Sequence, residues 1–235
     1  MIITSINNQI VKDTVKLHQK KYRDEQSLFL MEGYHLYEEA LKHGIIKTIF
    51  TTDENIQGHN VIHVSQQVLE KISQMKSTQG VLVVCEKIKK NEITDRVLIL
   101  EKIQDPGNIG TLLRSALGFD FKTVILDNTC DLYNDKVIRS TQGNLFKLNI
   151  IEMNTIDFMN EHNEYTYYGT EMNGESLSTI NKDNKIAIIL GNEGNGVSKE
   201  VLSKTSKNIS IKTNIESLNV GVAGSIIMHH IYMGE

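Results

Sequence analysis

The sequence contains two cysteines, a single proline and no long hydrophobic run. Cys85 and Cys130 are too few for a disulfide framework and are not spaced as a metal-binding knuckle, so a reducing cytoplasm is the expected location. No apolar stretch approaches the roughly 20 residues that span a bilayer, and the first residues lack the charged start and apolar core of a signal peptide. We therefore expect a globular protein without a membrane partner.

Charge is unevenly distributed along the chain. The formal net charge of −4 argues against a protein that binds nucleic acid over its whole surface. Residues 1–90 nevertheless hold 12 Lys and Arg against 10 Asp and Glu, whereas residues 91–235 hold 13 against 19. Residues 11–23 contain one acidic residue and five basic ones, namely Lys12, Lys16, Lys20, Lys21 and Arg23. Such a run is either a solvated helix face or a surface that contacts phosphates.

Hydrophobic periodicity divides the chain into two parts. Residues 1–88 alternate short apolar runs with helical patterns, beginning with an amphipathic helix expected over residues 7–22, and predict a small α/β domain. Residues 89–96 lack an apolar pattern and are the expected linker. In residues 97–235, longer apolar runs alternate with helical patterns, which predicts a parallel sheet covered by helices on both faces. Ligands of such sheets bind beyond the carboxyl ends of the strands.

Three stretches of the second part place polar residues and glycines at expected strand ends. The first is EKIQDPGNIGTLLRSALGF at residues 101–119. It contains the only proline, Pro106, and we expect Asn108 to cap the helix that follows. Arg114 lies six residues after Asn108, so the two side chains need not share a helix face. Taken alone, this stretch is equally consistent with a capped helix that carries a surface arginine.

The second stretch, AIILGNEGNGVSKEV at residues 187–201, leads a buried strand into three glycines and then into a helix capped by Ser198. Glu193 in this loop is costly unless its carboxylate is hydrogen-bonded or faces a ligand. The glycine spacing matches neither a Walker A loop nor the GxGxxG pattern of dinucleotide-binding enzymes. An ordinary strand-to-helix turn remains the alternative interpretation.

The third stretch, NIESLNVGVAGSIIMHHIYM at residues 214–233, begins a helix with small residues. Ser217 and Asn219 precede it, and Gly221 and Gly224 lie in its first turns. Serine and asparagine are good helix caps, and glycine allows close packing, so a purely structural explanation is available. Each of the three stretches is a modest signal alone, but their combination in this order is specific.

In this order, the three stretches resemble the three motifs of the SpoU/TrmH-type RNA ribose 2′-O-methyltransferases of the SPOUT superfamily. The stretch DLYNDKVIRSTQGNLFKLNI at residues 131–150 is similar to the family's intervening segment. SLFLMEGYHLYEEALKHG and KSTQGVLVV, both within residues 1–88, resemble the small L30e-like substrate-binding domain of the ribosomal-RNA members. The resemblance covers nearly the whole chain.

The resemblance implies an α/β fold in which residues 1–88 bind substrate and residues 97–235 form a parallel-sheet SPOUT domain with a C-terminal trefoil knot. The knot would hold S-adenosylmethionine, and the protein would be a homodimer with its active site near the interface. The small residues that begin the last helix would let the chain pack closely against this cofactor. The residues expected to contact it are Gly191, Ile211, Leu218 and Thr170.

One departure from the family concerns the cofactor loop. The family usually has a proline after the isoleucine that we place at Ile211, where this chain has Lys212. The span from there to Ser217 is also about two residues short, so we expect a slightly different loop.

The family's catalytic set matches Asn108, Arg114, Glu193, Ser217 and Asn219. A ribose hydroxyl is a weak nucleophile that must be polarised as it attacks a methyl group. Because a guanidinium stays protonated, we expect Arg114 to stabilise the developing alkoxide and to hold an RNA phosphate, with Glu193 and Asn108 orienting it. Ser217 and Asn219 would shape the hydroxyl pocket, and no metal is expected.

The N-terminal domain favours ribosomal RNA as the target, because the minimal transfer-RNA members tend to lack such a domain. The basic residues of the stretch 11–23 are the candidate RNA contacts, together with Lys136 and Arg139. A transfer-RNA 2′-O-methyltransferase remains an alternative. Another is an RNA-binding protein of the same fold without catalysis, against which the intact polar set argues.

Overall fold

The structure is a computed structural model that describes residues 2–75, 77–88, 92–181 and 185–234. Part of the expected linker, residues 89–91, lies outside this range. The chain forms two compact units, which are Met1–Ile88 with Tyr133–Gly143, and Lys89–Leu132 with Asn144–Glu235. The segment Tyr133–Gly143 lies inside the stretch expected to form the second domain, and it groups with the first unit.

The first unit is built on a mixed sheet. Its strands in the described residues are β1 (Ile2–Ile3), β2 (Leu28–Glu32), β3 (Ile46–Thr51), β4 (Val61–Val64) and β5 (Val81–Glu86). Their spatial order is β1-β4-β3-β5-β2, and β5 runs antiparallel to both of its neighbours while the other pairs are parallel. The helices of this unit are α1 (Gln9–Lys16), α2 (Lys20–Gln26), α3 (Tyr34–Lys42), α4 (Gln66–Ile72) and α6 (Asp135–Thr141).

The single helix expected over residues 7–22 was wrong, because the structure has two helices there. Gln19, between α1 and α2, adopts an extended conformation. Arg23 is buried, and its Nη1 donates hydrogen bonds to the carbonyl oxygens of Leu17 and His18, both at 2.7 Å. These carbonyls follow the end of α1 and have lost their helical partners. A buried guanidinium therefore stabilises the break between the two helices.

The second unit contains a six-stranded parallel sheet in its described residues, as the sequence predicts. Its strands are β6 (Arg96–Glu101), β7 (Thr123–Asp127), β8 (Asn149–Glu152), β9 (Thr166–Ser176), β10 (Ile186–Leu190) and β11 (Lys207–Ser210). Their order is β11-β9-β10-β6-β7-β8, and every neighbouring pair is parallel. All five residues of β10 are buried, because both faces of the sheet are covered.

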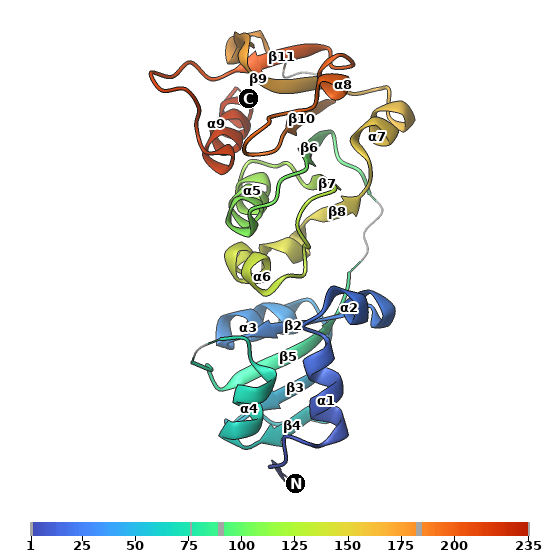
Figure 1. Ribbon diagram of the computed structural model, residues 1–235, viewed down its shortest axis with the longest axis vertical. Coiled ribbons are helices and arrows are strands. Elements are labelled where there is room, and N and C mark those ends of the chain that lie inside the picture. The colour runs from blue at the N-terminus through green and yellow to red at the C-terminus, as the bar shows by residue number, and fades with distance from the viewer. Residues whose placement is uncertain (1, 76, 89–91, 182–184, 235) are drawn as a thin grey trace. The chain divides into compact units, whose positions relative to one another are not determined.

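Helices cover the two faces of this sheet. They are α5 (Pro106–Gly118), α7 (Thr155–Glu161), α8 (Lys199–Leu202) and α9 (Val220–Tyr232), with short 3₁₀ turns η1 (Asn144–Lys147) and η2 (Leu177–Thr179). Figure 1 shows α5 and α9 on one side of the sheet and α7 and α8 on the other. Phe158 of α7 and Val201 of α8 belong to the core cluster that includes Ile99 and Ile189. No helix in the described part of the chain is long and apolar enough to cross a membrane.

The two glycines in the first turns of α9 lie against other parts of the protein. A Cβ atom at Gly224 would lie 2.4 Å from Leu112 of α5 and 2.5 Å from Leu190 of β10. A Cβ atom at Gly221 would lie 3.3 Å from Thr111, also in α5. Packing within the protein thus requires small residues at these two positions, and their close approach to the cofactor stays a prediction. They let α9 pack tightly against α5 and the sheet.

Candidate active site

Three loops that carry the sequence motifs lie at the carboxyl edge of the parallel sheet. Strands β6 and β10 are neighbours in register, with Leu100 opposite Leu190, so the segments that leave them begin side by side. Residues 102–105 leave β6 and lead into α5, and residues 191–198 leave β10 and lead into α8. Residues 211–219 connect β11 to α9. Parallel sheets bind their ligands at this edge.

The start of α5 buries Asn108. Asp105 is the residue that caps this helix, because its Oδ1 accepts a hydrogen bond from the Asn108 N–H at 2.9 Å. Pro106 takes the first helical position and favours an extended conformation for Asp105 before it, as a cap requires. The prediction that Asn108 caps the helix was therefore wrong. Its side chain lies in the first turn, 8% exposed, and is available for tertiary contacts.

Glu193 ties two of the loops together. Its Oε1 accepts hydrogen bonds from Asn108 Nδ2 at 3.1 Å and from the Asp105 N–H at 3.0 Å. Its Oε2 accepts from the Gln104 N–H and from Asn192 Nδ2, both at 3.3 Å. Burial alone would raise the pKa of this carboxyl, but hydrogen bonds from Asn108 and from backbone N–H groups outweigh burial and lower it. Glu193 is therefore ionised at neutral pH.

Asn219 joins the third loop to the same network. It caps α9, since its Oδ1 accepts hydrogen bonds from the N–H groups of Gly221 and Val222. Its Nδ2 donates to Asn108 Oδ1 at 2.9 Å. Asn108 thus donates to Glu193 and accepts from Asn219, and the structure brings together these three predicted residues from three separate stretches.

Arg114 and Ser217 stand apart from this network. Arg114 is exposed on α5, and no hydrogen bond or ion pair to it is found among the described residues. Glu193 and Asn108, which we expected to orient Arg114, contact each other instead. Ser217 is exposed in the loop before α9. Both side chains are thus accessible to a substrate.

The residues expected to contact the cofactor lie in or after the adjacent strands β11, β9 and β10. Gly191 follows β10, and a Cβ atom there would lie 2.0 Å from the backbone nitrogen of Val197, so the fold of the loop itself requires glycine. Thr170 in β9 donates its hydroxyl hydrogen to the Ile189 carbonyl at 2.9 Å. Ile211, after β11, and Leu218 are half-buried apolar side chains in the third loop.

Sequence reasoning did not single out Gln104 and Asn192. The side chain of Gln104 donates to the Asn128 carbonyl at 2.8 Å, and the side chain of Asn192 donates to the Lys102 carbonyl at 3.0 Å. Both are polar residues directly beside motif residues at strand ends, which was the available signal. They hold the loops around Glu193 in place.

The basic residues of the first unit are mostly paired with acids. Lys16 lies 2.8 Å from Asp13, Lys20 lies 3.4 Å from Asp24, and Lys21 lies 3.9 Å from Glu25. Lys12 is exposed. Arg23 is the exception: it is buried against backbone carbonyls, so its assignment as an RNA contact is corrected to a structural one.

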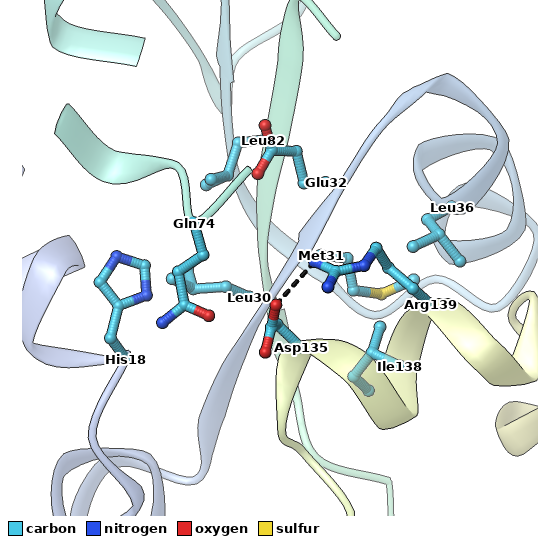
Figure 2. Close-up of a pocket in the computed structure, with 10 residues that line it drawn as sticks. All are labelled: His18, Leu30, Met31, Glu32, Leu36, Gln74, Leu82, Asp135, Ile138 and Arg139. Carbon is cyan, nitrogen blue, oxygen red and sulfur yellow. Dashed lines mark ion pairs between the residues drawn. The ribbon is translucent and has the colours of Figure 1, made fainter. Parts of the chain in front are cut away.

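Arg139 lines a pocket in the first unit, shown in Figure 2. Its Nη1 lies 2.6 Å from Asp135 Oδ2, one turn earlier on α6, while Lys136 of the same helix is exposed. Glu32 and His18 also line the pocket. The Ser73 hydroxyl donates a hydrogen bond to the Glu32 carboxylate, which favours its ionised form. Burial outweighs this effect and raises the pKa of Glu32.

No group of three or more His, Cys, Asp or Glu side chains suited to a metal ion occurs in the described residues. The predicted catalytic residues at the sheet edge offer the amides of Asn108 and Asn219, the ionised carboxylate of Glu193, and the exposed guanidinium and hydroxyl of Arg114 and Ser217.

Comparison with known proteins agrees with this arrangement. The model of the SpoU rRNA Methylase family matches residues 95–229, more than half of the chain. The chain belongs to this family. A second model, the MRM3-like substrate binding domain, matches residues 8–83.

Two proteins similar to this SpoU methylase match all or nearly all of its length. The 23S rRNA (guanosine(2553)-2′-O)-methyltransferase RlmP of Bacillus subtilis is 37% identical, with 97% of this chain and 98% of the relative covered. The crystal structure of an rRNA methyltransferase from Sinorhizobium meliloti with bound S-adenosylmethionine is 27% identical. The two structures match with a TM-score of 0.90, and the match covers 100% of this chain and 98% of the Sinorhizobium meliloti chain. Human mitochondrial rRNA methyltransferase 3 is 28% identical over 56% of this chain and 36% of its own length.

Proposed function

We propose that this SpoU methylase transfers the methyl group of S-adenosylmethionine to a ribose 2′-hydroxyl of ribosomal RNA. The observation that carries the proposal is the hydrogen-bonded chain Glu193–Asn108–Asn219, which joins the three family motifs at the carboxyl edge of the sheet. RlmP of Bacillus subtilis is named for a guanosine of 23S rRNA. A guanosine ribose in the large-subunit RNA is therefore the first substrate to test.

The residues at this edge fit S-adenosylmethionine. Ile211 and Leu218 offer half-buried apolar surface for an adenine ring, and the adjacent loops offer backbone polar groups. Gly191 directly follows β10 and Thr170 lies in the neighbouring strand β9, which runs parallel to β10. When bound, S-adenosylmethionine supplies an electrophilic methyl group on a sulfonium.

We assign roles to the polar residues from their contacts and from their exposure to solvent. Arg114 brings an exposed positive charge, suited to hold an RNA phosphate and to stabilise the negative charge that develops on the ribose oxygen. Glu193 accepts four hydrogen bonds and its pKa is lowered, so it is a weak base and acts by fixing the loops. The exposed hydroxyl of Ser217 is placed to contact the ribose. The proton of the 2′-hydroxyl passes to water.

The two parts of the chain divide the work. Residues 1–88 bind RNA and residues 97–235 carry the methyltransferase site. The RNA surface that we propose consists of Lys12, Lys16, Lys20, Lys21, Lys136 and Arg139. All six residues lie on the helices α1, α2 and α6, and phosphates would replace carboxylates as partners of Lys16, Lys20, Lys21 and Arg139.

The protein acts as a homodimer in the cytoplasm, where ribosomes are assembled. Support for the dimer comes from α9 and the residue after it, which expose the apolar side chains of Val222, Ile226, Tyr232 and Met233 at exposed fractions of 39% to 65%. A second copy of the chain would cover this face. We also propose that the segment from β11 through α9 is threaded as a trefoil knot, in keeping with the bond between Asn219 and Asn108.

Two measurements test the function. Calorimetry with S-adenosylmethionine is expected to give binding to wild type and to Arg114→Ala. Methyl transfer to ribosomal RNA from cells that lack the gene, read by mapping 2′-O-methylated nucleotides, is expected in wild type and reduced about 100-fold in Arg114→Ala. Lys122→Ala, which removes an exposed charge paired with Asp120, is the matched control and should methylate normally.

Other outcomes contradict the proposal in different ways. Methylation of transfer RNA alone would overturn the assigned substrate but keep the chemistry. Binding of RNA and cofactor without methyl transfer would indicate a silent RNA-binding protein. The absence of cofactor binding at millimolar concentration would overturn the methyltransferase itself, and the short loop after Ile211 would then be the first region to examine.

A further inference from the structure

Glu101, the first residue of the stretch 101–119, is a buried carboxylate that the proposed mechanism does not use. It ends β6 and is 2% exposed. Its Oε2 accepts a hydrogen bond from the Ser198 N–H at 2.8 Å, and its Oε1 lies 3.0 Å from Lys102 Nζ. Burial raises the pKa of this carboxyl, but the hydrogen bonds from Ser198 and Lys102 outweigh burial and lower it. The group is therefore ionised, and it is stabilised by these two partners.

The loop between Asn192 and Ser198 is attached to the end of β6 at both of its ends. At the first end, Asn192 Nδ2 donates to the Lys102 carbonyl at 3.0 Å. At the other end, the Ser198 N–H donates to Glu101. The loop closes on itself, because the Gly196 N–H donates to the Asn192 carbonyl at 2.9 Å. Glu193 lies inside this closed loop, so its position depends on both attachments.

We infer that Glu101 is a positioning residue, which acts through Ser198 to hold Glu193 against Asn108. The inference rests on the proposed function for its catalytic consequence, but the clamp itself is a property of the fold. Glu101 does not belong to the surface that a substrate would meet, since it is buried. Its contribution is to keep the loop in the one arrangement in which Glu193 reaches Asn108, Asp105 and Gln104.

A neighbouring carboxylate provides a matched control. Asp127 ends β7 directly opposite Glu101 in the sheet, and it is also buried. Its Oδ2 accepts a hydrogen bond from the Thr155 N–H at 2.8 Å, at the start of α7. The two acids therefore make the same kind of bond to the start of a helix. Only Glu101 does so on the loop that carries Glu193.

The experiment compares Glu101→Gln with Asp127→Asn in the full chain. Each substitution keeps the size of the side chain and removes its charge. Hydrogen exchange is expected to become about tenfold faster at residues 192–198 in Glu101→Gln, the effect of weakening one charge-assisted hydrogen bond. In Asp127→Asn the faster exchange should appear at residues 154–158 instead. The kcat for methyl transfer should fall about tenfold in Glu101→Gln and stay within about twofold of wild type in Asp127→Asn.

The inference is overturned if Glu101→Gln leaves both the exchange of residues 192–198 and kcat unchanged. It is also overturned if Asp127→Asn lowers kcat as much as Glu101→Gln does, because the effect would then be one of general stability. The exchange measurement needs no activity. If wild type transfers no methyl group, the proposed function fails, and exchange still decides whether the clamp exists.

A second pair of variants serves if Glu101→Gln does not fold. Ser198 has φ −64°, which proline also adopts, so Ser198→Pro removes the N–H that reaches Glu101 while leaving the carboxylate in place. Ser198→Ala keeps that N–H and removes only the hydroxyl. We expect faster exchange and lower kcat in Ser198→Pro than in Ser198→Ala. Equal values in the two variants would contradict the clamp.

Discussion

Asn108 connects two motif loops because its amide has one donor end and one acceptor end. Its Nδ2 meets the Glu193 carboxylate, and its Oδ1 meets the amide of Asn219. An aspartate of the same shape could accept from Asn219 but would face Glu193 with a second negative charge. An alanine would leave Asn219 and Glu193 without this partner. At the scale of single residues, the site is therefore set by direction of hydrogen bonding as well as by charge.

We predict that Asn108→Asp lowers the free energy of unfolding by about 1–3 kcal/mol and abolishes most methyl transfer. The reason is that the hydrogen bond from Asn108 to Glu193 would be lost and two carboxylates would face each other instead. Adding Glu193→Gln should restore part of the lost stability, since the new amide at position 193 could donate a hydrogen bond to the new carboxylate at position 108. Urea unfolding of the two single variants and the double variant measures this coupling. Additive effects to within about 0.5 kcal/mol would contradict a direct contact between the two side chains.

His18 makes the stability of the first unit dependent on pH. Burial, and next the charge of Arg23, lower the pKa of its imidazole from 6.5. As the pH falls, His18 therefore takes up a proton in the unfolded chain at a higher pH than in the folded chain. The free energy of unfolding decreases from about pH 6.5 downwards, until the pH falls below the lowered pKa of His18 in the folded protein.

We predict that His18→Gln reduces this loss of stability between pH 7 and pH 5, measured as the change in melting temperature. His59→Gln, at an exposed histidine of the same unit, is the control and should keep the pH dependence of wild type. Identical profiles for His18→Gln and wild type would show that protonation of His18 is not involved.

At the scale of elements, close packing between α9 and α5 explains why α9 begins with small residues. Gly224 lies against Leu112 and Leu190, and Ser225 Oγ lies 2.7 Å from Ser115 Oγ. A helix with larger side chains here would stand further from the sheet, and Asn219 at its start would move away from Asn108. The packing of α9 thus determines the geometry of the site.

We predict that Gly224→Ala lowers the free energy of unfolding by about 1–3 kcal/mol, because the new methyl group would overlap two leucine side chains. It should also weaken cofactor binding. Gly118→Ala in α5 is the matched control: a Cβ atom there has no neighbour within 4 Å, and alanine should stabilise the helix by about 0.5–1 kcal/mol. Thermal unfolding of both variants measures the difference, and equal effects would contradict tight packing at Gly224.

At the scale of the whole molecule, the exposed apolar face of α9 is the feature that the single chain does not explain. Val222, Ile226 and Tyr232 lie on a helix whose other face is in the core, and Met233 follows directly after it. Isolated exposed apolar residues are common, but four so close together mark an interaction surface.

We predict that Ile226→Lys weakens the homodimer by about 2 kcal/mol or more, because a charge would be placed in an apolar interface. Sedimentation equilibrium should show a dimer for wild type and monomers for the variant at the same micromolar concentration. Leu41→Lys, at an exposed leucine on α3, should leave the dimer intact. A wild-type protein that is monomeric throughout this range would contradict the proposal.

The sequence by itself determined most of the elements of this protein and the position of its motifs relative to the strands. Buried strands such as β10 and helices such as α5 follow from local periodicity. The sequence alone also predicts that the motifs after β6 and β10 lie at the carboxyl edge of a parallel sheet. Each of these properties depends on residues that are close together in the chain.

Tertiary structure alone decided which side chains meet. Asn108 and Glu193 are 85 positions apart, and Asn108 and Asn219 are 111 apart, so no local pattern could pair them. The same holds for Arg23, whose charge suggests a surface residue until the carbonyls at the end of α1 are seen around it. Such contacts depend on the order of the strands and on the packing of distant helices, because hydrogen-bond direction and burial are properties of the folded neighbourhood and not of the residue type.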